Sequence, residues 1–235
     1  MSGFLLCFGA AVLLQWGLTE NCLRTIWKDI ILRNKILIFG DSITYGQRDL
    51  ELGGWTNRLK LVISNDKIGI SCHIFNMGIP GQTTGEVLER LDRECTGRMP
   101  KGTNTIIMLA AGINDTQIIN GEVRTDEETL RSNVKGLIET AKQRADHVMY
   151  VGLTPVDESR TNPVWWDRKK HWRNEVVENY DTIIRRVCEE QGIRYIYMFD
   201  KIDPLTNHDG LHPSAEGHRI MTGIISGAVY ECLKR

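Results

Sequence analysis

Several common functional signatures are missing from this sequence. Neither of the glycine-rich phosphate-binding patterns, G-x-G-x-x-G and G-x-x-x-x-G-K-[ST], occurs in it, so nucleotide binding of the dinucleotide or P-loop type lacks its main support. The six cysteines include no C-x-x-C pair, which argues against a zinc site or a redox motif. The 29 Lys and Arg residues are balanced by 30 Asp and Glu residues. A chain without a basic excess is a poor candidate for binding nucleic acid.

The first 34 residues differ in character from the rest of the chain. Phe4 to Leu14 is an unbroken apolar or small stretch, shorter than the roughly 20 residues of a membrane span. A secretory signal would require a basic n-region and an A-x-A-like cleavage site. Here no basic residue precedes Arg24, and no such cleavage site is evident. From Leu18 to Ile31, apolar residues recur at helical spacing. The alternatives are a membrane-associated helix, an uncleaved anchor, or an extension packed on the domain.

The location of the protein depends on this N-terminal segment. If it contacts a membrane, the basic residues that follow the apolar run would keep the next domain in the cytoplasm. We therefore expect a cytoplasmic protein, with membrane association through residues 1–34 as one of the open alternatives for that segment and secretion as the alternative location.

Strand and helix patterns alternate from residue 35 to the end of the 235-residue chain. We expect strands at Lys35–Phe39, Ser71–Asn76, Thr105–Ala110, His147–Leu153 and Arg194–Phe199. We expect helices at about Trp55–Ser64, Thr84–Arg93, Asp126–Arg144, Trp172–Gln191 and Ser214–Leu233. This alternation predicts a single α/β domain over residues 35–235, with a parallel sheet covered by helices on both faces.

Ser42 lies at the end of the first expected strand, in the stretch Lys35–Gln47 with the sequence KILIFGDSITYGQ. The carboxyl ends of strands are where open parallel sheets bind ligands, so a serine in this place is a candidate nucleophile. The alternative is that Asp41 and Ser42 only cap a helix. The G-x-S-x-G signature of nucleophile-elbow hydrolases is absent.

Three further stretches stand where a site would be expected. They are Asn76-Met77-Gly78-Ile79-Pro80-Gly81 after the second strand, Ala111-Gly112-Ile113-Asn114-Asp115 after the third, and Asp209-Gly210-Leu211-His212-Pro213 before the last helix. Together with Gly40-Asp41-Ser42-Ile43, these stretches resemble, in order, the four sequence blocks of the GDSL esterases, also called SGNH hydrolases. Isoleucine replaces the leucine of the family name, and the resemblance covers about residues 35–233.

The resemblance implies an α/β, flavodoxin-like three-layer fold with a five-stranded parallel sheet in the order 2-1-3-4-5. It also implies Ser42 as nucleophile, His212 as base and Asp209 as the carboxylate that orients the base. The backbone N–H groups of Ser42 and Gly78 and the side-chain amide of Asn114 would form the oxyanion hole.

The chemistry agrees with these roles. A serine hydroxyl is a weak nucleophile that needs a base within hydrogen-bond reach and a third group to orient that base. Alternatives exist for each block taken alone: Gly78 as a turn glycine, Asn114-Asp115 as a helix cap, and His212-Pro213 as a mere helix start. A metal site at His208, Asp209 and His212 lacks the H-E-x-x-H pattern or further ligands.

We therefore predict a serine hydrolase that cleaves carboxylic esters of small or lipid acyl groups through an acyl-enzyme, with no metal or organic cofactor. The alternatives are an O-acetyl-carbohydrate esterase or an acyltransferase of the same fold, and, in another class, a non-catalytic binding module. The long connection at residues 157–172 carries Trp165 and Trp166. At least one of these two is expected to border the substrate cleft; the alternative is that both pack in the core with Trp172.

Overall fold

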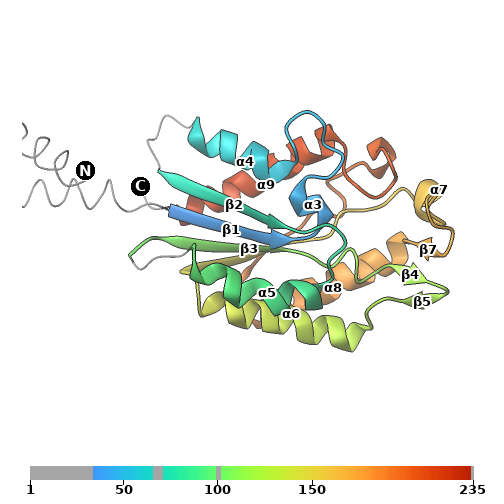
Figure 1. Ribbon diagram of the computed structural model, residues 1–235, viewed down its shortest axis with the longest axis horizontal. Helices are drawn as coiled ribbons and strands as arrows, with labels where there is room; N and C mark the ends of the chain where they lie inside the picture. The colour runs from blue at the N-terminus through green and yellow to red at the C-terminus, as the bar shows by residue number, and fades with distance from the viewer. Residues whose placement is uncertain (1–33, 66–70, 99–101, 234–235) are drawn as a thin grey trace, which may run out of the picture.

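A five-stranded parallel sheet forms the centre of the molecule (Figure 1). The computed structural model describes residues 34–65, 71–98 and 102–233. The sheet has the order β2-β1-β3-β6-β8, which confirms the predicted order. Its strands are β1 (Asn34–Gly40), β2 (Cys72–Gly78), β3 (Thr105–Ala110), β6 (His147–Val151) and β8 (Arg194–Ile196).

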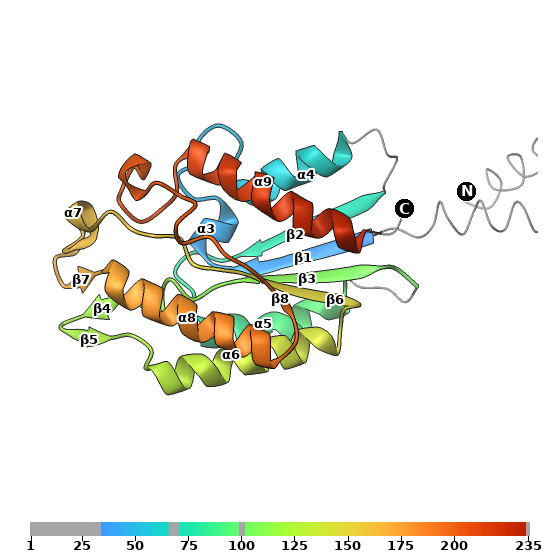
Figure 2. The same cartoon turned by 180° about the vertical axis from the view of Figure 1, so that it is seen from behind.

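Helices cover both faces of the sheet, as Figures 1 and 2 show from opposite sides. One face carries α4 (Trp55–Ser64) and α9 (Ala215–Cys232), and the other carries α5 (Thr84–Thr96), α6 (Glu127–Lys142) and α8 (Asn174–Glu190). All five coincide with the predicted helices, and α4 does so at both ends. Polar side chains begin several of them: Thr83 and Glu86 form a reciprocal capping box at α5, and Asp126 and Ser214 cap α6 and α9.

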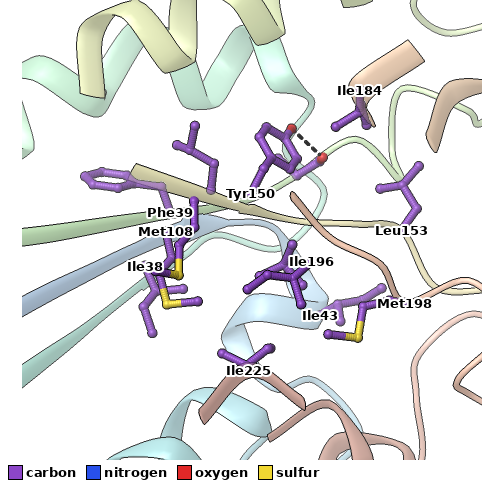
Figure 3. Packing of buried hydrophobic residues seen from close by; sticks show 14 of the residues in the cluster. Ile38, Phe39, Ile43, Met108, Tyr150, Leu153, Ile184, Ile196, Met198 and Ile225 are labelled. Carbon is purple, nitrogen blue, oxygen red and sulfur yellow. Dashed lines mark hydrogen bonds between the residues drawn. The ribbon is translucent and has the colours of Figure 1, made fainter. Parts of the chain in front are cut away.

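The buried centre of the sheet explains why β1 reads as an unbroken apolar run. Ile36, Leu37, Ile38 and Phe39 have no exposed surface, because helices pack on both faces of a strand that has neighbours on both sides. Figure 3 shows Ile38 and Phe39 close to Met108 of β3, with Tyr150 of β6 near them. The Tyr150 hydroxyl donates to Ala111 O at 2.8 Å, which satisfies its polar tip within the core.

Shorter elements gather beyond the carboxyl ends of the strands (Figure 1). They are α3 (Ser42–Tyr45), α7 (Glu158–Thr161), the 3-10 helix η1 (Pro204–Thr206), and a small antiparallel sheet of β5 (Glu122–Val123), β4 (Ile118–Ile119) and β7 (Lys170–His171). Strands of two residues leave no periodic pattern, and the sequence did not predict them. The long connection at 157–172 thus contains a helical turn, α7, and a short strand, β7.

The predicted N-terminal segment lies outside the described residues, except for Asn34. This asparagine opens β1, one residue earlier than expected, and its buried side chain donates to Ser71 O at 3.1 Å and accepts from Asn104 Nδ2 at 2.7 Å. In the part of the chain that the structure describes, no helix combines the length and the apolar character needed to cross a membrane.

Candidate active site

The turn after β1 is built so that Ser42 begins a helical turn against the neighbouring strand. Asp41 Oδ1 accepts the Ile43 N–H at 2.9 Å and so caps α3. Thr44 Oγ1 donates to Ala110 O at 3.1 Å, which ties α3 to the end of β3. A side chain at Gly40 would place its Cβ 2.2 Å from Ala110 O. Glycine is therefore required here, because the end of β3 approaches the backbone at Gly40 too closely for a side chain.

Ser42, His212 and Asp209 form one hydrogen-bonded chain. The Ser42 Oγ lies 2.8 Å from His212 Nε2, and His212 Nδ1 lies 2.7 Å from Asp209 Oδ2. Each of the three residues is at most 5 % exposed. A serine, an imidazole and a carboxylate in this order have the geometry of a charge-stabilised nucleophile and its base.

The loop before α9 holds the carboxylate in its ionised form. Asp209 Oδ1 accepts the backbone N–H groups of Leu211 at 3.0 Å and of His212 at 2.9 Å. Burial by itself would raise the pKa of Asp209, but the hydrogen bonds and charge of His212 and these backbone donors hold it well below the usual value. The short spacing from Asp209 to His212 thus lets one turn supply both the carboxylate and the imidazole.

Comparison with known proteins identifies the family to which this arrangement belongs. The model of the GDSL-like lipase/acylhydrolase family matches residues 38–220, a range that includes all three side chains of the hydrogen-bonded chain. The chain belongs to the GDSL-like lipase/acylhydrolase family. Carboxylic ester hydrolysis in general follows from that membership. No curated protein matches the chain.

Solved structures similar to this family member include several esterases. A lipase/acylhydrolase from Enterococcus faecalis is 22 % identical, with a TM-score of 0.67 over 86 % of this chain and 97 % of that one. LAE5, an alpha/beta hydrolase enzyme from the metagenome of Lake Arreo, Spain, is 18 % identical, with a TM-score of 0.62 over 86 % and 96 %. A variant of Axe2, an acetyl xylan esterase from Geobacillus stearothermophilus, is 16 % identical, with a TM-score of 0.65 over 86 % and 96 %. At these identities the likeness establishes the shared fold.

The strand register brings the other family blocks to the same edge of the sheet. Gly40 is paired with Gly78 of β2 on one side and with Ala110 of β3 on the other. Asn114 follows β3 by four residues and is buried. The ends of three adjacent strands thus carry Ser42, Gly78 and Asn114, at the place where open α/β sheets bind ligands.

Two of the three expected oxyanion donors, Gly78 and Asn114, have protein partners in this structure. The Gly78 N–H donates to Asn76 Oδ1 at 2.9 Å, and Asn114 Nδ2 donates to Gln82 O at 3.0 Å. An amide nitrogen carries two hydrogens, so Asn114 keeps a second donor. A side chain at Gly78 would place its Cβ 2.3 Å from Tyr45 N, which gives this glycine a packing role against α3 as well.

Two side chains fix the loop that carries Asn114. Asp115 accepts the Thr84 N–H at 2.9 Å and the Thr84 hydroxyl at 2.6 Å, and so joins the loop to the start of α5. Trp172, which is buried, donates its indole N–H to Ile113 O at 2.9 Å. Trp172 therefore helps to hold the loop that carries Asn114, a contact that its position in the sequence did not reveal.

Trp165 and Trp166 lie on the surface between α7 and β7. Their rings make an edge-to-face contact with centroids 5.5 Å apart, and they are 72 % and 41 % exposed. Neither belongs to the core that contains Trp172, and neither lines the groove beside Gly78.

Sequence reasoning missed Arg48, which contacts the hydrogen-bonded chain. Its Nε lies 3.2 Å from Asp209 Oδ2, the oxygen that also faces His212. The residue follows Ser42 by six positions in a loop, where no periodicity or motif distinguishes it from any other surface arginine. Within the described residues, no cluster of three or more His, Cys, Asp or Glu side chains could hold a metal ion, and His208 is exposed.

Proposed function

We propose that the protein hydrolyses carboxylic esters through an acyl-enzyme intermediate on Ser42. The observation that carries this proposal is the chain of two short contacts, 2.8 Å from Ser42 Oγ to His212 Nε2 and 2.7 Å from His212 Nδ1 to Asp209 Oδ2. In this arrangement His212 Nε2 accepts the serine proton while the Nδ1–H donates to Asp209. The carboxylate fixes the tautomer and stabilises the imidazolium as it forms.

Acylation and deacylation use the same groups, and water takes the place of the serine hydroxyl as the nucleophile in deacylation. Ser42 Oγ attacks the carbonyl carbon, its proton passes to His212, and the C–O bond to the alcohol breaks as His212 returns the proton to the departing oxygen. A water molecule then gives a proton to His212 and attacks the acyl carbon. The Ser42 oxygen leaves with that proton, and the acid is released.

The negative charge that develops on the carbonyl oxygen needs fixed donors. We assign this function to the backbone N–H of Ser42 and the second amide hydrogen of Asn114, both of which lie at the ends of adjacent strands. The Gly78 N–H is the third donor, and it joins the hole by exchanging its bond to Asn76 Oδ1, 2.9 Å away, for one to the oxyanion.

A polar ester with a short acyl group is the substrate that the surroundings favour. A groove of about 730 Å³ begins at Gly78. The side-chain amides of Gln47 and Asn57 and the Arg48 guanidinium line it, together with Tyr45 and Leu50, whereas the Asn76 amide is already bonded within the protein. Amides and a guanidinium pair with the hydroxyl or charged groups of a polar alcohol, whereas a long acyl chain needs a predominantly apolar pocket. An O-acetylated sugar has the required chemistry, and an acetyl xylan esterase is among the structural neighbours.

An activity panel tests this proposal. Hydrolysis rates are measured for para-nitrophenyl esters with acyl groups from two to sixteen carbons and for acetylated sugars. We expect the highest kcat/KM with acetyl esters and a decline as the acyl group lengthens. A kcat/KM that rises with chain length up to the longest esters would contradict the assignment of the polar groove to the substrate.

A further inference from the structure

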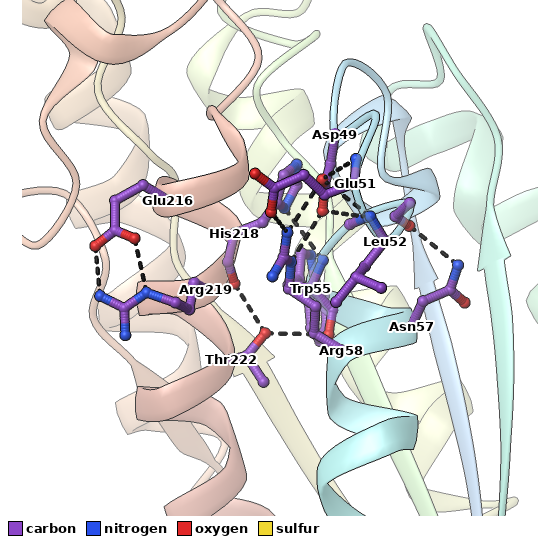
Figure 4. Close-up of polar contacts among 12 residues, drawn as sticks. Asp49, Glu51, Leu52, Trp55, Asn57, Arg58, Glu216, His218, Arg219 and Thr222 are labelled. Atoms are coloured by element: carbon purple, nitrogen blue, oxygen red, sulfur yellow. Dashed lines mark hydrogen bonds and ion pairs between the residues drawn. The ribbon is translucent and has the colours of Figure 1, made fainter.

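The loop between α3 and α4 is a rigid platform beside the active site. The buried carboxylate of Asp49 accepts the Gly54 N–H at 2.9 Å and pairs with Arg58 Nε at 2.9 Å. On the other side, the Trp55 N–H donates to His218 Nδ1 at 3.2 Å, which links α4 to α9. Figure 4 shows Asp49, Arg58 and His218 gathered at this junction. Burial lowers the pKa of His218 to about 4, so the ring is neutral and able to accept this bond at neutral pH.

Arg48 projects from this platform toward Asp209. Its backbone has a φ of 73°, in the left-handed region that non-glycine residues adopt uncommonly. Its Nε is 3.2 Å from Asp209 Oδ2, and its side chain is 45 % exposed. Among the described residues, neither terminal nitrogen of the guanidinium has a hydrogen-bonding partner, so both are available to a ligand in the groove.

Among the described residues that line the groove, Arg48 is the exposed charged side chain. Of the described residues that line it, only Arg48 and Asp49 are charged. Asp49 is buried and pairs with Arg58, whose Nη2 also pairs with the exposed Glu51 carboxylate at 3.0 Å. Arg58 is thus shared by two carboxylates, and Asp209 pairs with the Nε of Arg48, which leaves the terminal nitrogens of Arg48 as the free cationic donors among the described residues that line the groove. The groove that Gly78 lines therefore also presents an exposed guanidinium with its two terminal nitrogens.

We propose that Arg48 binds an anionic group, a carboxylate or a phosphate, that the ester substrate carries near its scissile bond. This inference rests on the proposed esterase function and adds the class of substrate. A guanidinium presents parallel N–H donors that match carboxylate and phosphate oxygens. The Nε bond to Asp209 and the fixed loop hold the side chain in place, so little rotamer entropy is lost when the anion binds. Arg48 also contacts the same Asp209 oxygen that faces His212.

Matched pairs of esters test the proposal by turnover. On the alcohol side, phenyl acetate is compared with meta-acetoxybenzoate and meta-acetoxyphenyl phosphate. On the acyl side, para-nitrophenyl hexanoate is compared with mono-para-nitrophenyl adipate. The measured quantity is the ratio of kcat/KM for the anionic ester to that for its neutral partner. A charged hydrogen-bonded pair predicts a ratio above 10 for at least one pair.

The same ratio in variants isolates the anion contact from the contact to Asp209. Arg48→Gln changes Asp209's surroundings equally for both esters of a pair, so its effect on the ratio reports only the anion. We expect Arg48→Gln to reduce the ratio to about 1 and Arg48→Lys to retain part of it. The matched control is Arg219→Gln on α9, where Arg219 pairs with Glu216 at 2.7 Å outside the groove (Figure 4). Its ratio should equal that of the wild type.

A binding measurement separates this inference from the proposed esterase function. The affinities of meta-hydroxybenzoate, meta-hydroxyphenyl phosphate and phenol are determined by calorimetry in the Ser42→Ala background, with and without Arg48→Gln. Tighter binding of either anion that disappears with Arg48→Gln supports the anion site, whether or not any ester is turned over. Equal binding with and without Arg48, or an anionic preference that survives Arg48→Gln, would overturn it. Absence of turnover with every ester would count against the esterase function instead.

Discussion

Replacing Asp41 with asparagine should stabilise the protein, and more strongly as the pH rises. The Asp41 carboxyl is buried beside a cavity of about 20 Å³ that apolar Ile43 and Leu153 help to line. Burial raises the pKa of Asp41 from 3.8 to about 7, although the hydrogen bond from the Ile43 N–H and the charge of His212 act in the opposite direction. The folded protein therefore carries an acid whose ionisation is unfavourable in its native place.

The sign and size follow from proton linkage. Between its unfolded pKa of 3.8 and its folded pKa of about 7, Asp41 keeps its proton in the folded state and loses it in the unfolded state. The free energy of unfolding then falls as the pH rises through this window. A gap of about 3 pKa units corresponds to at most about 4 kcal/mol. Asparagine does not titrate and retains an oxygen that accepts the Ile43 N–H, so the variant escapes this loss.

Urea unfolding of both proteins between about pH 4 and pH 8 measures the effect. The variant and the wild type should differ least near pH 4, and the advantage of Asp41→Asn should grow until it levels off above about pH 7. Asp41→Ala, which removes the cap on α3 as well as the charge, should fall below Asp41→Asn by about 1 kcal/mol at every pH. A difference between Asp41→Asn and wild type that stays constant over the whole range would refute the reasoning.

Three further perturbations test other parts of the account. Asn114→Ala should lower kcat about 10²–10³-fold with little change in KM, as expected for one lost oxyanion donor; an increase in KM alone would make Asn114 a binding residue. Trp165 and Trp166 lie outside the groove and are exposed, so their alanine variants should change Tm little, and a changed kcat/KM ratio between short and long acyl esters is expected only where one of the rings borders the acyl group; an unchanged ratio in both variants would contradict a place beside the substrate. A chain that begins at Asn34 should remain folded and active, because β1 begins there; aggregation or inactivity on gel filtration and assay would show that the preceding residues are needed.

Much of the fold could be predicted because its signals are strong and local. The apolar run Ile36–Phe39 reads as a doubly buried strand, and α4 has the predicted bounds Trp55–Ser64. Element ends that depend on distant partners were wrong. Leu153 was placed in the fourth strand, but its N–H donates to Asp181 of α8 at 2.7 Å, so the chain has already left the sheet. Trp172 was placed in a helix, but its N–H donates to Thr161 O at 2.9 Å, and α8 begins at Asn174.

The residues of the candidate site likewise fall into those that the sequence predicts and those that it does not. Its principal residues occupy short blocks of recognisable spacing, and the strand order places the blocks at one edge of the sheet. Arg48 and Trp172 act on the site through contacts with Asp209 and Ile113, which are 161 and 59 positions away. Such contacts depend on the folded arrangement of loops, for which a single sequence carries no periodic signal.

The turnover number of Ser42→Ala tests the central claim most directly. Alanine fits the buried position at the start of α3, where the serine hydroxyl makes its hydrogen bond to His212, so the variant should keep the wild-type circular dichroism and Tm. With para-nitrophenyl acetate, kcat should fall about 10⁴-fold or more, because His212 and Asp209 have no nucleophile left to activate. A folded Ser42→Ala protein that retained a tenth of the wild-type kcat would contradict the assignment of Ser42 as the nucleophile.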